Sequence, residues 1–341
     1  MRVAIYYSND DVRIEEMPIP SIGSKEMLVK VHASGICGSD VMEWYRIKKA
    51  PRVLGHEITG EIVKVGDDIE GYDIGDRVFV SHHVPCGSCK YCEDDHTSVC
   101  DTLRSTNFDP GGFAEYLRVP EINVEKGVYE LPTNMNYSEG VFVEPLACVV
   151  RGQKFLDVGS DDTVLVIGSG LSGMLHIKLA LAKGVKRVIA TDISQYRLET
   201  AKRIGAKTAL KAEDVTPPNI RKANDGCLPE RVIVSVGVSS AMEQAFKTVD
   251  KGGRILLFAP LKPDEMLPMP VWDLWKDEVS ITTSYAASGD DIQEAIELIS
   301  SGKVKVDDMI SHKLPLEEAQ EGFKLTAKGE DSLKVIIKPH M

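Results

Sequence analysis

The chain has 341 residues, more than one hydrophobic core usually holds, so two domains are expected. Its composition, 43% hydrophobic and 27% charged, is that of an ordinary globular protein. The formal net charge is −12 and no basic run of the kind that binds phosphate backbones is present, which argues against nucleic acid as a partner. No apolar run approaches the roughly 18 residues of a membrane helix, so no membrane association is expected.

The first 130 or so residues predict a β-rich region. β-branched residues and alternation, separated by turn sequences, predict strands within 26–35, 56–66, 76–84 and 111–120. Over residues 136–156 apolar residues recur at helical spacing, and Ser138 is the predicted N-cap of that helix.

From Thr163 onward, predicted strands and helices alternate. The strands fall at 163–168, 187–192, 231–237 and 254–260, with helices at 170–184, 194–206 and 239–253. This alternation predicts a parallel, doubly wound sheet, so the fold class is α/β. Three further segments are interpreted as a surface loop, a helix and a strand: 217–226, 289–302 and 332–339.

A glycine pattern, Gly168-Ser-Gly170-Leu171-Ser-Gly173, follows the first of these strands and opens a helix. Such glycines allow a tight turn and a close approach of backbone to a pyrophosphate, which the free N–H groups of the helix N-terminus then bind. The alternative is a glycine turn that binds nothing.

Asp192 ends the next predicted strand, where a carboxylate accepts hydrogen bonds from ribose hydroxyls and repels a 2′-phosphate. NAD is therefore favoured over NADP, although Asp192 could instead be a helix N-cap. Arg197 is a candidate to stack on the adenine, or an ordinary exposed helical arginine. Val236 and Gly237 complete the candidate cofactor contacts.

Four of the seven cysteines, Cys86, Cys89, Cys92 and Cys100, have the spacing C-x2-C-x2-C-x7-C. The odd number of cysteines and the lack of a signal-peptide pattern argue against a disulfide framework and favour the cytoplasm. Four converging thiolates complete a closed tetrahedral zinc site, which is structural because no position is left for substrate. An iron–sulfur cluster is the alternative, but the proline that usually follows the fourth ferredoxin cysteine is missing. Unliganded core cysteines do not suit the acidic residues at 93–95.

A second candidate metal set consists of Cys37, His56, Glu57 and Glu144. A thiolate, an imidazole and a carboxylate suit a catalytic zinc with one open position. Taken singly, these residues could equally be a buried hydrophobe, a core histidine and surface charges.

The motifs G-x-C-G-S-D, G-H-E-x2-G-x4-V-G, G-D-R-V, the four-cysteine lobe, E-P-L and G-x-G-x2-G occur here in that order. From about residue 2 to the C-terminus the chain therefore resembles the zinc-containing medium-chain alcohol dehydrogenases. The resemblance implies a GroES-like catalytic domain at 1–146 with a structural zinc lobe at 86–100, a Rossmann NAD-binding domain at 147–285, and a return to the first domain at 286–341. It also implies an active site in the cleft between the domains, two zinc ions per chain, and a homodimer or homotetramer.

Carried over from the family, Cys37 and His56 match ligands of the catalytic zinc. Prototype alcohol dehydrogenases have a cysteine where Glu144 stands, and a glutamate there resembles the polyol and threonine dehydrogenase branch. Glu57 is then the expected third ligand, with Glu144 either exchanging with it or holding the zinc-bound water. Cys148, four residues beyond Glu144, is a competing candidate.

Ser39 matches the first group of the family's proton relay, because a hydroxyl both accepts and donates a hydrogen bond. Many relatives have a histidine at the next relay position, where this chain has Met42, so the relay is broken there. Trp44, Tyr45 and Tyr285 could border the substrate, or could simply pack.

The resulting hypothesis is zinc-dependent transfer of hydride to NAD from a secondary alcohol of a polyol, sugar, cyclitol or amino alcohol such as threonine. The segment between Cys37 and His56 is shorter than in typical polyol members, so no single substrate is transferred from the family. Two alternatives are a zinc-free reductase on the same scaffold and a binding module built on the cysteine lobe.

Overall fold

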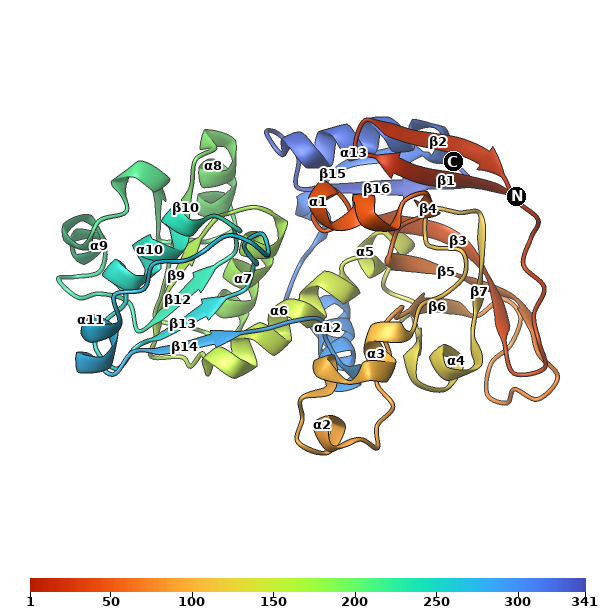
Figure 1. Ribbon diagram of the computed structural model, residues 1–341, viewed down its shortest axis with the longest axis horizontal. Coiled ribbons are helices and arrows are strands. Elements are labelled where there is room, and N and C mark those ends of the chain that lie inside the picture. Colours follow the sequence, from red (N-terminus) through yellow and green to blue (C-terminus); the bar gives the residue numbers. More distant parts are fainter. The chain divides into compact units, whose positions relative to one another are not determined.

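The computed structural model describes residues 1–341 and divides into two compact units. The first unit combines Met1–Ala147 with Ala286–Met341, and the second is Cys148–Tyr285 (Figure 1). None of the helices is long and apolar enough to cross a membrane.

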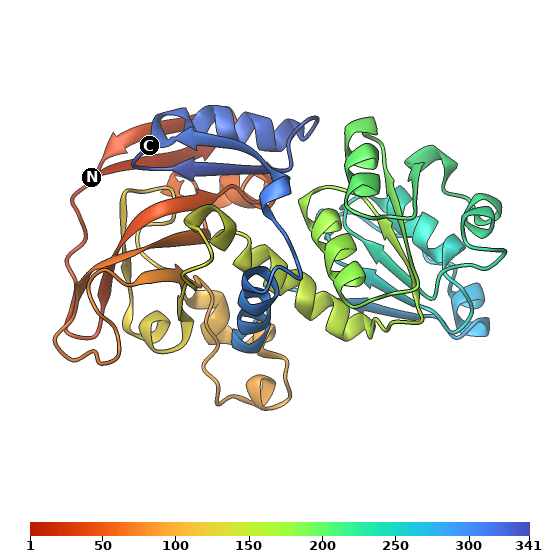
Figure 2. The same cartoon turned by 180° about the vertical axis from the view of Figure 1, so that it is seen from behind.

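The first unit is built on a seven-stranded sheet in which a C-terminal strand pairs with N-terminal ones (Figures 1 and 2). Its order is β15 (Ile310–Pro315), β16 (Lys334–Lys338), β3 (Met27–Gly35), β5 (Glu57–Val65), β6 (Arg77–Val80) and β8 (Val128–Glu130), with β7 (Tyr116–Val119) also paired to β3. A small sheet joins β2 (Asp11–Glu16), β1 (Arg2–Ser8) and β4 (Arg52–Val53).

Helices connect these strands. They are α1 (Glu43–Arg46), α2 (Lys90–Glu93), α3 (Asp101–Ser105), α4 (Glu121–Gly127), α5 (Tyr137–Gly140), α12 (Gly289–Ser300) and α13 (Ala319–Lys328), while α6 (Val143–Leu156) leads into the second unit. The alternating apolar residues of β3 and β5 enter one buried cluster, which includes Val29, Val31 and Ile58. This packing fixes the strand register on which the residues described below depend.

The second unit holds a six-stranded, wholly parallel sheet, as the sequence predicts. Its order is β11 (Thr208–Lys211), β10 (Arg187–Asp192), β9 (Thr163–Ile167), β12 (Arg231–Val234), β13 (Arg254–Leu257) and β14 (Ser280–Thr283). Helices α7 (Leu171–Ala182), α8 (Gln195–Arg203), α9 (Pro217–Ala223), α10 (Ser239–Thr248) and α11 (Val271–Lys276) complete the unit, with helices on both faces (Figures 1 and 2). The chain runs outward from β9 in one direction and then in the other, so β9 and β12 flank a topological switch point.

Two local predictions are wrong. Asn136, and not Ser138, is the N-cap, because its side chain accepts hydrogen bonds from the backbone N–H groups of Ser138 and Glu139. The Glu139 carboxylate in turn accepts from the backbone N–H of Asn136, which completes a capping box. The segment 217–226 contains helix α9 and is not wholly a loop. Proline is tolerated in the first turn of a helix, and Ile220 is buried against the sheet.

Candidate active site

Cys37, His56 and Glu57 are brought together by the pairing of β3 with β5. Gly35, the last residue of β3, lies opposite Glu57, the first residue of β5, so Cys37 and His56 emerge side by side. One thiol sulfur, one ring nitrogen and one carboxylate oxygen of these residues all lie within 4.8 Å of one another. The sequence predicted this set, and the fold places its members around one point.

The carboxylate of Glu57 is fully buried, and its two oxygens differ. Oε2 accepts a hydrogen bond from the ammonium group of Lys334, which is also fully buried and reaches from β16. Oε1 has no hydrogen-bond partner. A buried carboxylate oxygen without a partner is costly, and a cation beside Cys37 and His56 would satisfy it. The donor set of sulfur, nitrogen and oxygen therefore fits zinc with an open coordination position.

Asp40 contacts both Cys37 and His56. It is fully buried; its Oδ2 accepts from the backbone N–H of Cys37 at 3.1 Å, and its Oδ1 lies 3.4 Å from Nδ1 of His56. Burial opposes the charge on Asp40, but His56, Arg46 and the Cys37 N–H together hold the pKa of its carboxyl below the usual value. A carboxylate in this place fixes the orientation and tautomer of a metal-binding imidazole.

Two further histidines lie beside His56. The rings of His56 and His82 are 4.9 Å apart, those of His82 and His83 are 3.8 Å apart, and Nδ1 of His82 is buried without a partner. Burial, followed by the positive charge of His56 and Arg46, lowers the pKa of His83 to about 4. Both His82 and His83 are therefore neutral imidazoles at neutral pH, since burial also lowers the pKa of His82.

The other predicted catalytic residues occupy separate places. The backbone N–H of Ser39 donates to the sulfur of Cys37 at 3.4 Å. Glu144 lies half-buried in the first turn of α6 and is not among the three converging ligands; neither is Cys148. Met42 precedes helix α1, which carries Trp44 and Tyr45 with ring centroids 5.9 Å apart, and Tyr285 is exposed.

The sequence analysis did not assign roles to several polar residues around Cys37, His56 and Glu57: Asp40, Arg46, His82, His83 and Lys334. Only Asp40 had a local signal, because it belongs to the same G-x-C-G-S-D motif as Cys37. Lys334 lies 277 residues from Glu57, a separation at which no spacing rule applies.

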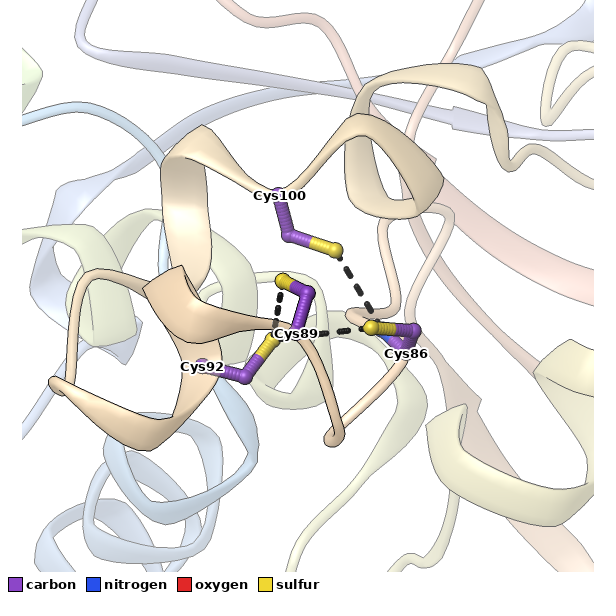
Figure 3. A group of neighbouring side chains, drawn as sticks. All are labelled: Cys86, Cys89, Cys92 and Cys100. Carbon is purple, nitrogen blue, oxygen red and sulfur yellow. Dashed lines mark hydrogen bonds between the residues drawn. The ribbon is translucent and has the colours of Figure 1, made fainter.

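Cys86, Cys89, Cys92 and Cys100 form the second converging group (Figure 3). The sulfur of Cys92 lies 3.9 Å from that of Cys86 and 3.5 Å from that of Cys89, close to the separation of about 3.8 Å expected for thiolates around tetrahedral zinc. The N–H and hydroxyl of Ser88 donate to the sulfur of Cys86 and lower its pKa to about 6, whereas burial raises the pKa of Cys92 to about 11. The four sulfurs fit one metal ion with no position left open.

The glycine loop of the second unit has the geometry that the sequence predicts. Gly168 has φ +90°, a conformation that favours glycine, and a Cβ on Gly173 would overlap the Gly168 carbonyl oxygen. Gly170 is the N-cap of α7 and Leu171 is its first residue, so free backbone N–H groups begin at this turn. The loop can therefore hold a phosphate group at the start of α7.

Asp192 ends β10 beside this loop. Its Oδ2 accepts from the backbone N–H of Ser169 at 2.7 Å and its Oδ1 from that of Ser194 at 2.8 Å. Ser194, not Asp192, is the N-cap of α8, so the alternative given above for Asp192 is wrong. Asp192 keeps lone pairs that can accept from ribose hydroxyls.

The remaining predicted cofactor residues border the same loop. The guanidinium of Arg197 lies 3.8 Å from Asp192 and packs over Gly170, while Val236 contacts Gly168 from the end of β12. Gly237 follows, and a Cβ added there would overlap the carbonyl oxygen of Pro260, so no side chain fits at this position.

The chain is similar in sequence and fold to known proteins. Residues 23–132 match the family model of the alcohol dehydrogenase GroES-like domain, and residues 173–301 match that of the zinc-binding dehydrogenase. Sheep (Ovis aries) sorbitol dehydrogenase is 32% identical over 98% of this chain and 95% of its own length.

Two solved structures share the fold over 99% of both chains at 29% identity and a TM-score of 0.88. They are an alcohol dehydrogenase from Thermus sp. ATN1 and an alcohol dehydrogenase from Escherichia coli CFT073 complexed with NADH.

The fold and the residues around Cys37 therefore define a zinc-dependent alcohol oxidoreductase that uses a nicotinamide cofactor. The chain belongs to the zinc-containing medium-chain alcohol dehydrogenase family, in its polyol dehydrogenase branch. It is an enzyme of the NAD-dependent zinc alcohol dehydrogenase class, with a GroES-like domain and a Rossmann domain.

Replacing a cysteine of the lobe tests the structural metal site. We expect Cys100→Ser to lower the zinc content by one ion per chain, because a buried sulfur ligand is lost. The thermal midpoint should fall by about 5 °C or more, since metal binding contributes to folding. Cys227→Ser, which changes an exposed cysteine of the second unit, should alter neither quantity. Unchanged zinc content in Cys100→Ser would contradict the site.

Replacing the third glycine tests the phosphate loop. We expect Gly173→Ala to weaken NADH binding at least about tenfold, because the new methyl group displaces the Gly168 carbonyl and deforms the turn. A fluorescence titration measures this affinity. Gly159→Ala, at a glycine with only an ordinary contact in the same unit, is the matched control. Equal affinity in both variants would rule out a cofactor role for the loop.

Proposed function

We propose that the enzyme oxidises a secondary alcohol of a polyol, sugar, cyclitol or amino alcohol, with NAD as hydride acceptor and two zinc ions per chain. The observation that carries this proposal is the convergence of Cys37, His56 and Glu57, with one buried carboxylate oxygen left without a partner. Three protein ligands leave a coordination position for substrate, whereas the four-cysteine group leaves none.

Different residues of the chain would bind the metal and orient its ligands in this reaction. Cys37, His56 and Glu57 would hold the catalytic zinc, with Glu144 exchanging with Glu57 or holding a water beside it. Zinc bound there supplies Lewis acidity, which lowers the pKa of an alcohol hydroxyl. Asp40 keeps the ring of His56 in one orientation by its contact with Nδ1.

Oxidation removes a hydride and a proton from the alcohol. A nicotinamide bound at the glycine loop would supply the hydride acceptor, so that the alcohol carbon would lose its hydrogen with the electron pair and become a carbonyl. The hydroxyl proton leaves separately, and we assign Ser39 as the first group to receive it, because a hydroxyl can both accept and donate a hydrogen bond. The thioether of Met42 carries no proton, so the path beyond Ser39 would have to use the nicotinamide ribose, Glu144 and water, or some other group.

The choice of NAD over NADP rests on Asp192. Its carboxylate lies at the end of β10 beside the glycine loop, where it accepts from ribose hydroxyls and repels a 2′-phosphate. Arg197 contributes a planar group next to it that can stack on the adenine. We place the enzyme in the cytoplasm, a reducing compartment in which the neighbouring thiols of the cysteine lobe stay available to metal.

Activity measurements test the assigned residues. We expect His56→Ala and Glu144→Ala each to abolish turnover while NADH binding survives, because the change removes a metal-site residue and leaves the glycine loop intact. A panel of polyols, inositols, aldoses and threonine with NAD, followed by NADH absorbance, identifies the substrate class. His340→Ala, at an exposed histidine of the first unit, is the control. Turnover like that of the unaltered enzyme in both site variants would refute the assignment.

We also propose that the enzyme is a homo-oligomer in which two copies meet along β14. This strand is the edge of the parallel sheet and pairs only with β13. Next to it, Trp272 and Trp275 are 68% and 70% exposed. A mostly apolar groove there is lined by Met269, Val271, Leu274, Trp275, Val279 and Ile281, together with Lys276 and Glu278. A second copy related by a two-fold axis would pair the two edges and cover both apolar surfaces.

Sedimentation velocity tests this surface. We expect the double variant Trp272→Ser with Trp275→Ser to shift the enzyme from dimer or tetramer toward smaller species, because it removes the largest exposed apolar side chains beside β14. Ile74→Ser, which changes a 69% exposed apolar residue of the first unit, should leave the mass unchanged. A monomeric parent enzyme, or a double variant of unchanged mass, would contradict the proposed interface.

A further inference from the structure

Arg46 contacts both the predicted relay residue Ser39 and the buried Asp40. It ends helix α1, in the segment between Cys37 and His56, and only 14% of its side chain is exposed. Its Nε donates to the backbone carbonyl of Ser39 at 2.9 Å, and its Nη2 donates to the Ser39 hydroxyl oxygen at 3.0 Å. The same Nη2 lies 3.3 Å from Oδ1 of Asp40.

The first consequence concerns the hydroxyl of Ser39. A hydroxyl has one hydrogen to donate and two lone pairs, and an arginine only donates because it stays protonated. The bond from Arg46 therefore occupies one lone pair and turns the Ser39 hydrogen toward another acceptor. One lone pair and one hydrogen remain, which is the minimum that a proton relay between two other groups requires.

The second consequence concerns the carboxylate of Asp40. Its Oδ1 is shared between Arg46 and Nδ1 of His56, while its Oδ2 accepts from the N–H of Cys37. A fully buried carboxylate needs opposite charge beside it, and Arg46 supplies a fixed positive charge that does not depend on the imidazole. Arg46 and His56 therefore face the same carboxylate oxygen, and the place of the imidazole depends on where the guanidinium holds Asp40.

We propose that Arg46 is a positioning residue that holds the Ser39 hydroxyl and the Asp40–His56 pair in one arrangement. The planar fork of a guanidinium reaches both partners at once, which the single ammonium of a lysine does not. Arg46 thus holds the hydroxyl of Ser39, which is the last residue of the family's proton relay that this chain keeps, because Met42 replaces the next one. This inference rests on the proposed function, because it assigns Ser39 and His56 the roles given above.

A purely structural role is the competing account. The guanidinium also lies over the ring of Tyr45, 4.8 Å from its centroid, so Arg46 could merely pin helix α1 to the domain. In that case, replacing Arg46 would lower stability and leave the metal site and the kinetics of properly folded enzyme unchanged.

The test compares Arg46→Met and Arg46→Lys with a control, Lys48→Met, which removes an exposed positive charge two residues away. Zinc release to a chromogenic chelator is measured first. The catalytic zinc ion is identified as the one that is missing from the His56→Ala variant. We expect Arg46→Met to release the catalytic zinc ion at a chelator concentration at least about tenfold lower than the unaltered enzyme requires. Residues that contact metal ligands from outside change metal affinity by about 10–100-fold. Lys48→Met should behave like the unaltered enzyme.

Steady-state kinetics distinguish the effect of Arg46 on Ser39 from its effect on Asp40. In Arg46→Met, kcat for the alcohol should fall about 10–100-fold while KM for NAD is unchanged, since the cofactor loop is intact. In Arg46→Lys the charge beside Asp40 returns, so zinc retention should recover, whereas kcat stays low because one ammonium cannot also orient Ser39. Methylguanidinium added to Arg46→Ala should restore part of kcat.

Three outcomes would overturn the proposal: normal zinc retention and normal kcat in Arg46→Met, full recovery of both in Arg46→Lys, or a lowered thermal midpoint as the sole change. If the unaltered enzyme binds two zinc ions and turns over no alcohol in the panel, the proposed function fails. The zinc-release experiment still decides whether Arg46 acts on the Asp40–His56 pair.

Discussion

The fully buried carboxylate of Glu57 is the constraint around which the catalytic unit is arranged. A charge in this position must be compensated, and the fold provides Lys334 on one side and a candidate metal position beside Cys37 and His56 on the other. Both neighbours depend on β3, which pairs with β5 on one edge and with β16 on the other. Gly35 lies between them, because a side chain there would overlap the Glu57–Lys334 pair.

The two metal-binding groups are built by different physical means. The four-cysteine lobe draws its sulfurs from fifteen consecutive residues in loops and short helices, so the metal itself contributes to the order of that segment. The residues of the catalytic group instead lie at the ends of paired strands, where Asp40 contacts Cys37 and His56, Lys334 contacts Glu57, and Arg46 contacts Asp40. Rigid support of this kind suits a site in which one coordination position must stay available to substrate.

Local patterns carried most of what the sequence could predict. The cysteine spacing, the glycine turn and the alternation of strands and helices after Thr163 are short-range features, and comparison with the structure confirms the α/β architecture. The N-cap at Asn136 was missed because Ser138, two residues later, is also a suitable N-cap. Helix α9 was missed because its two prolines are also typical of a loop. Lys334 and Arg46 could not be assigned, since their roles follow from burial and from contacts that only the folded chain creates.

Diffraction data collected on both sides of the zinc absorption edge test the central claim most directly. The account predicts two anomalous peaks per chain: one within about 2.3 Å of four cysteine sulfurs, and one bound by the sulfur of Cys37, a nitrogen of His56 and a glutamate oxygen. A single peak in the lobe, or a second peak away from Cys37 and His56, would contradict it.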